Sequence, residues 1–279
     1  MTARLTPWEV AFGPERYGAE VFPAIRRAAH DLGARASVLD AFMMMEAVRL
    51  HLHELIAGDV PTEPPADALL EYGALLFHGF RFWSHDRSLY LLTDDLARSL
   101  FDAALPLGEW QLAPPVPAGY VQLPRHLLWA RVATDVPAEP IDGFFWSVAG
   151  THADDEAPWQ RLDLLLALGM RPDRPGFSII DVTTALPAPP PGHFGDVSAR
   201  AGGDDFSNIL PGGEMTGLYG VTSVAEALKL ASRTFHHIAT RPWTVSEPQR
   251  LESAPAEASF EMPPSTLPAR TVIHEERSD

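Results

Sequence analysis

Apolar residues recur at helical spacing through the first eighty residues, and this pattern predicts three helices. We expect them at about residues 23–32, 37–57 and 66–78. Pro23 suits the first turn of the first helix, and Gly33 is placed to end it. The N-terminal part of the chain, residues 1–79, is therefore expected to be mainly helical.

The predicted helix at 37–57 has the strongest pattern of the three. Ser37 and Asp40 resemble a capping box with Asp in place of Glu, and Gly58 is placed to end the helix. Apolar side chains occupy nearly all of its circumference. A helix of this kind usually lies at the centre of a protein. We therefore expect it to be the most buried helix.

Beyond residue 79 the pattern changes to short runs that are typical of strands. Residues 80–83 and 89–92 flank a polar loop of hairpin length, and a short helix is predicted at 93–104. Further strands are predicted at 120–123, 127–132, 144–148, 162–168 and 177–182. The leucine run at 162–168 fits a buried strand or a helix equally well. Because no long helix separates successive strands, an antiparallel meander is expected over residues 80–185.

The last third of the chain is rich in proline and glycine before one more helix. Residues 186–222 form a Pro/Gly-rich stretch, and Ser223 with Glu226 makes a capping box for a helix at 223–240. Residues 246–279 are acidic and proline-interrupted, which predicts an extended tail that lies on the body or on a partner.

Together these patterns predict an α+β fold in which a helical N-terminal layer packs on an antiparallel β-sheet. A C-terminal helix and an extended acidic tail complete the fold. Residues 1–245 are expected to form a single compact domain, because no clean linker divides them.

The amino-acid composition limits the cellular compartment and the kinds of site that we expect. The chain has 279 residues and no cysteine, so it forms no disulfide and has no thiolate ligand or nucleophile. This composition fits a reducing compartment, and a cytoplasmic location is expected. The apolar stretch at 39–56 contains Glu46, Arg49 and Glu54, too many charges for a membrane span. No cofactor and no metal are predicted.

Charge argues against nucleic acid as a partner. The formal net charge is −16, from 37 acidic and 21 basic residues. Binding to a phosphate backbone depends on clustered Lys and Arg, and the densest basic feature is the pair Arg26 and Arg27.

One acidic loop is the first place to look for chemistry. His152, Asp154, Asp155 and Glu156 put an imidazole and three carboxylates within five residues, after a predicted strand. Such groups suit a hard cation or an acid/base pair. The loop lacks the alternating ligands and central glycine of a calcium loop, so we expect a solvated turn.

A short motif near residue 78 resembles a known family. His78 and Gly79 follow Leu75, Leu76 and Phe77, and this run is similar to the His-Gly element of ADP-ribosyltransferases. The resemblance implies that His78 holds the nicotinamide-side ribose of the substrate. The tyrosine-bearing strand and the catalytic glutamate of that family have no matching residues here.

Two hypotheses about function follow. The first is a non-catalytic binding or assembly protein that acts through protein–protein contacts, with a protein partner or a second copy of itself. It is favoured because no complete catalytic motif is present and because the tail and the Pro/Gly-rich stretch suit partner contacts. The alternative is an enzyme that uses the 152–156 loop, or His78 in ADP-ribosyltransferase-like chemistry.

Overall fold

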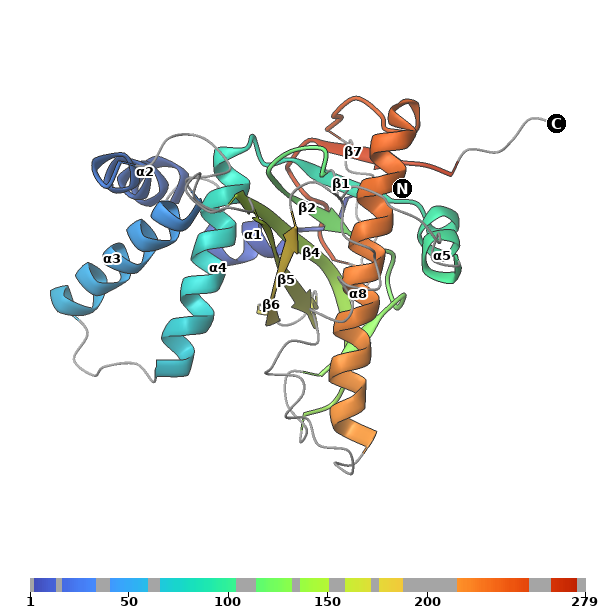
Figure 1. The fold of residues 1–279 in the computed structure, drawn as a ribbon, viewed down its shortest axis with the longest axis horizontal. Helices are drawn as coiled ribbons and strands as arrows, with labels where there is room; N and C mark the ends of the chain where they lie inside the picture. The colour runs from blue at the N-terminus through green and yellow to red at the C-terminus, as the bar shows by residue number, and fades with distance from the viewer. Residues whose placement is uncertain are drawn as a thin grey trace.

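The computed structural model describes residues 3–13, 17–33, 41–59, 66–103, 114–131, 136–150, 159–171, 176–187, 215–250 and 262–274. Its α-helices are α1 (Pro7–Phe12), α2 (Phe22–Asp31), α3 (Ala41–Asp59), α4 (Ala66–Ser84), α5 (Asp94–Asp102) and α8 (Met215–Thr240). Its strands are β1 (Leu89–Leu92), β2 (Ala118–Gln122), β3 (Trp129–Ala130), β4 (Glu139–Gly150), β5 (Trp159–Leu168), β6 (Ser178–Pro187) and β7 (Ala269–Val272). Helices and sheet together confirm the predicted α+β class (Figure 1).

The described strands form one mixed sheet in the order β6-β5-β4-β2-β1-β7, with β3 paired to β4. Strands β2, β4, β5 and β6 pair in antiparallel fashion, as predicted. However, β1 runs parallel to both β2 and β7, so a purely antiparallel meander is wrong for this half of the sheet. The reason is that the connection from β1 to β2 contains α5 and is long enough for a parallel crossover.

The leucine run at 162–168 is a strand, because it lies inside β5 between β4 and β6. Its side chains alternate between two cores. Leu164 and Leu166 pack into the cluster that includes Phe235 of α8. Leu165 packs into the cluster on the opposite face, which is built from α1 to α4. A strand buried on both faces is apolar at nearly every position, and Asp163 is the one polar residue of this run, so its sequence shows no alternation.

The sequence pattern predicts a strand at residues 80–83, but the structure shows that they continue α4 to Ser84. The aromatic side chains that suggested a strand pack against the N-terminal helices instead. Phe82 meets Trp8 with ring centroids 6.0 Å apart, and Phe80 meets Phe22 at the same distance. Burial against these rings replaces burial on a pleated surface, which is the usual source of the β-propensity of aromatic residues.

The prediction that the 37–57 helix is the most buried is also wrong. In the described part of α3 only Ala47 and Val48 are buried, and Leu50 is 39% exposed. Helix α4 lies between α3 and the sheet, and its residues 76–82 are all buried (Figure 1). The apolar residues of α3 mark contacts with α2, α4 and β4 rather than a central position. Ser37 and Asp40, the predicted cap, lie outside the described residues.

The C-terminal part of the chain contributes to the sheet. Helix α8 begins at Met215, before the predicted cap at Ser223, and packs on the same face as α5. Within the predicted tail, β7 pairs with β1, and Leu267 is 4% exposed. The domain boundary at residue 245 stays a prediction. Among the described residues, no helix combines the length and apolar character that a bilayer crossing requires.

We expect Leu267→Ala to lower the free energy of unfolding by about 2–5 kcal/mol, because truncating a buried leucine leaves a cavity. Ile273→Ala is the matched control, since Ile273 is 48% exposed and lies just after β7; its effect should stay within about 0.5 kcal/mol. Urea unfolding of both variants measures the difference. Equal stabilities would show that the segment does not dock on the body.

Candidate functional site

Helix α4 directs two polar side chains, His78 and Arg81, at the sheet. Arg81 is only 1% exposed, and its Nε donates a hydrogen bond to Ser147 Oγ on β4 at 3.0 Å. Its Nη1 lies 3.2 Å from Met44 Sδ on α3. Asp163, which is 3% exposed, lies opposite Ser147 on β5 and supplies the counter-charge.

Burial lowers the pKa of Arg81 to about 10, and the charge of Asp163 acts against this shift. The guanidinium is therefore charged at neutral pH despite its burial. Its contacts join α3 and α4 to β4 and β5. Arg81 thereby ties α3 and α4 to β4 through its own contacts and interacts with the charge of Asp163 on β5.

His78, the residue behind the ADP-ribosyltransferase resemblance, lies in the interior with a 2% exposed side chain. Its ring packs near Phe77 and Phe145, at centroid distances of 5.4 and 6.4 Å. Its Nε2 lies 3.9 Å from Asp181 Oδ1 on β6. Contact with a ribose would require the ring to leave this packing, and the implied role stays a prediction.

The acidic loop cannot be compared with this cluster. His152, Asp154, Asp155 and Glu156 all lie outside the described residues, so the enzyme hypothesis that rests on them stays a prediction. Within the described part of the chain, no three His, Asp or Glu side chains are grouped as a metal site would need.

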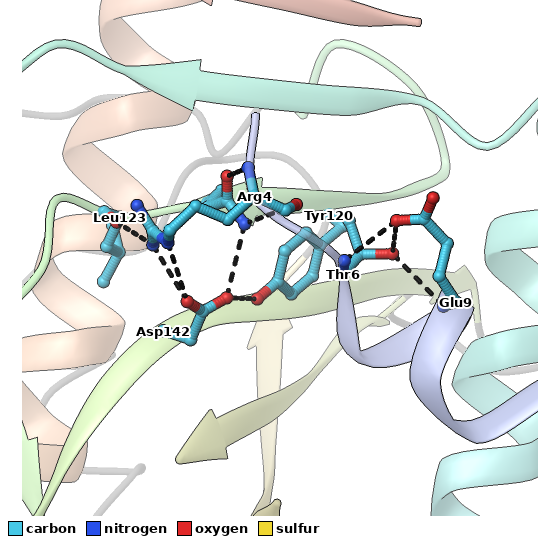
Figure 2. Close-up of polar contacts among 7 residues, drawn as sticks. Arg4, Thr6, Glu9, Tyr120, Leu123 and Asp142 are labelled. Carbon is cyan, nitrogen blue, oxygen red and sulfur yellow. Dashed lines mark hydrogen bonds and ion pairs between the residues drawn. The ribbon is translucent and has the colours of Figure 1, made fainter. Parts of the chain in front are cut away.

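A second buried cluster surrounds Asp142 (Figure 2). The Asp142 carboxylate accepts hydrogen bonds from Arg4 Nη2 at 2.9 Å and from Tyr120 Oη at 2.8 Å. Gln122 Nε2 lies 3.5 Å away, and Arg4 Nη2 also donates to the carbonyl of Leu123 at 2.7 Å. All of these donors belong to the protein itself, so the cluster fastens the N-terminal segment across β2 and β4.

The backbone around Asp142 is shaped for this contact. The register between β4 and β5 shifts between Ile141 and Gly143, so Asp142 lies at a β-bulge, a feature that re-aims side chains. A Cβ atom on Gly143 would meet the Tyr120 hydroxyl at 2.5 Å and the Val121 carbonyl at 2.2 Å. Glycine at position 143 therefore allows Tyr120 to reach Asp142.

Glu9 forms the third buried polar cluster, at the start of α1. One carboxylate oxygen accepts from the amide and hydroxyl of Thr6 and from the hydroxyl of Ser265. The other oxygen accepts from the amide and hydroxyl of Thr266, each at 2.8 Å. Five donors from two segments that are distant in sequence thus converge on the Glu9 side chain, and these bonds hold the start of α1 against residues 265–266.

The two edges of the sheet differ, and sequence reasoning did not detect this difference. The β7 edge is covered by residues 244–249 of the same chain. Ser246 N donates to Thr271 O, and Gln249 exchanges two backbone hydrogen bonds with Ala269, each at 2.9 Å. At the other edge, β6 pairs with β5 over ten consecutive residues without a bulge. No strand among the described residues pairs with its outer side.

The register identifies which residues of β6 face outward. Val148 on β4 donates its amide to Pro117 O at 2.9 Å, so its backbone groups point to β2. Its partner across β5 is Leu162, whose backbone groups therefore point to β6 and meet Thr184. Even-numbered residues of β6 bond to β5, and odd-numbered residues present N–H and C=O outward. Pro187 fits this assignment. Proline has no N–H, so an edge strand accepts it at an outward position, where no hydrogen bond to β5 is lost.

The comparisons with known proteins return little. No family model matches the chain, and no curated protein matches it. Among solved structures, the chain is similar to a crystal structure of AcrVA2, with 11% sequence identity and a TM-score of 0.45. The match covers 95% of this chain and 81% of that one. A likeness at this level carries no conclusion about function.

Arg81→Met should lower the free energy of unfolding by about 3–5 kcal/mol, because it removes the buried positive charge that interacts with Asp163 and the hydrogen bond to Ser147. The double variant Arg81→Met/Asp163→Leu removes both charges and should be less destabilised than the single variant. Arg49→Met is the control, since Arg49 is exposed on α3. A double variant whose loss equals the sum of the losses of Arg81→Met and Asp163→Leu would show that these two residues do not stabilise each other.

Tyr120 should make the protein less stable in alkali. Burial raises the pKa of Tyr120 well above its ordinary value of about 10, and the charge of Asp142 and the hydrogen bond to it act in the same direction. Above that pH the unfolded chain releases the phenol proton while the folded chain keeps it, so stability falls as pH rises. Urea unfolding between about pH 9 and 11 should show a steeper loss for the wild type than for Tyr120→Phe. Parallel curves would contradict the shift.

Proposed function

We propose that the protein is a non-catalytic binding protein that takes up a strand of another polypeptide chain along the outer edge of β6. The main support for this proposal is the edge itself. Its ten residues pair with β5 in regular register, and alternate residues direct backbone donors and acceptors outward. Addition of a strand to such an edge is a common mode of peptide recognition, in which main-chain hydrogen bonds provide affinity.

The composition of β6 supports this proposal. Natural sheets protect their edges with short strands, bulges, charged residues, prolines or covering segments. Strand β6 is long and has no bulge and no lysine, and Asp181 is its one charged residue. Five of its ten residues are Ile, Val or Thr, the β-branched residues that favour pairing. An edge with these properties pairs readily with another strand unless a covering segment or a partner occupies it.

The setting of this function follows from composition. We propose a cytoplasmic protein, because the chain lacks cysteine. We also propose a protein partner rather than nucleic acid, since a net charge of −16 repels phosphate backbones.

Thr183→Pro tests the proposal, because Thr183 is an odd-numbered residue whose N–H points outward. The variant removes one outward donor and leaves the ladder to β5 intact, so it should melt like the wild type. Thr183→Ala keeps the amide and is the matched control. Val182→Pro removes an inward donor and should lose stability strongly, which checks the assignment of directions.

The readout is co-purification of tagged protein from cells that naturally produce it. Proteins retained by the wild type and Thr183→Ala, and lost with a folded Thr183→Pro, would be the edge partners. Trp243→Ala, which changes a 66% exposed side chain near the opposite edge, should retain them. Identical sets of bound proteins in all folded variants would refute binding at β6.

A further inference from the structure

We infer that the strand added to β6 is the β6 strand of a second copy of this chain, in antiparallel pairing around a twofold axis at Val182. This inference rests on the proposed function and names its partner. The outward backbone groups permit this pairing, because an antiparallel contact about Val182 gives each of them a partner in the other copy.

The outward amides available within β6 are those of four residues: Ile179, Asp181, Thr183 and Ala185. Their midpoint is Val182. A twofold axis there pairs Ile179 of one copy with Ala185 of the other, and Asp181 with Thr183. Every outward N–H and C=O in the set then meets a partner, and none is left over.

Neighbouring registers are less favourable. An axis at Asp181 places two exposed carboxylates directly opposite each other, and like charges in that position destabilise a strand pair. An axis at Thr183 pairs Ile179 with Pro187, which has no N–H to donate. The charge of Asp181 and the missing N–H of Pro187 therefore favour the axis at Val182 over these two registers.

Self-pairing also closes the sheet. The β7 edge is already covered by residues 244–249, so the outer side of β6 is the open edge of the described sheet. An isologous contact uses this edge in both copies and leaves no strand edge for further growth. A closed dimer thereby resolves the hazard that a long regular edge otherwise presents.

Net charge predicts how the dimer responds to salt. Each copy carries −16, so two copies repel each other at low ionic strength. The screening length falls from about 10 Å at 0.1 M salt to about 3 Å at 1 M. Salt should therefore strengthen self-association, whereas it would weaken the binding of a basic partner.

Sedimentation equilibrium of the full chain is the first test, over a range of protein concentrations and from about 0.05 to about 0.5 M NaCl. We expect the mass to rise from 30.5 kDa towards twice that value as protein or salt increases. Thr183→Pro should remain a monomer, and Thr183→Ala should dimerise like the wild type. A wild type that stays a monomer throughout, or a Thr183→Pro that dimerises normally, overturns the inference.

Cysteine cross-linking tests the register, because the chain has no cysteine of its own. With the axis at Val182, the two Val182 residues form a non-hydrogen-bonded pair about 4.5 Å apart between Cα atoms, within disulfide range. Val182→Cys should therefore form a cross-linked dimer under mild diamide oxidation. Ile180→Cys should not, because Ile180 lies opposite residue 184 of the other copy.

Cross-linking of both variants, or of Ile180→Cys alone, would overturn the assigned axis. If Val182→Cys melts below the assay temperature, the sedimentation result decides.

The proposed function can survive the failure of self-pairing. A monomeric wild type whose partners are lost only with Thr183→Pro binds a different protein at the same edge. A monomer whose partners are unaffected by Thr183→Pro refutes both.

Discussion

Two buried carboxylates, Glu9 and Asp142, hold the ends of the chain on the sheet, and the positions of the other elements depend on them. Asp142 binds Arg4, and Glu9 binds the segment at Ser265 and Thr266. Each carboxylate is surrounded by donors, which offsets the cost of burying its charge. Because α1 begins between these two anchors, they also fix the helix whose Trp8 lies within the aromatic core.

The sheet connects these anchors to the helices above it. Tyr120 donates to Asp142 and packs its ring 4.6 Å from that of Phe145, so the same side chain belongs to the polar clamp and to the core. Further along β4, Ser147 receives Arg81 of α4. Three neighbouring contacts on one strand thus determine where the N-terminal segment and α4 lie. The partners of these side chains in the structure are other groups of the same chain, so their contacts serve the fold.

Sequence patterns identify most helices and strands, because burial determines both the apolar pattern of the sequence and the packing of these elements. The leucine run of β5 and the apolar face of α8 could be located from side-chain type alone. The errors have a common cause in tertiary contacts. Phe80 and Phe82 are helical because Trp8 and Phe22 lie nearby, although these rings are distant in sequence. Asp142 and Gly143 precede the predicted strand at 144–148, but the structure places them inside β4 at a bulge, where Arg4 and Tyr120 bond to Asp142.

The candidate site was missed for a different reason, since the property that defines it belongs to the backbone. Whether an amide points inward or outward depends on strand register, and register follows from hydrogen bonds such as that between Val148 and Pro117. Once the register is known, proline becomes informative. Pro187 stands at an outward position, where it leaves the ladder to β5 complete and ends the run of outward donors. The usable edge is thereby limited to the residues centred on Val182, and its length is set by the same register that folds the sheet.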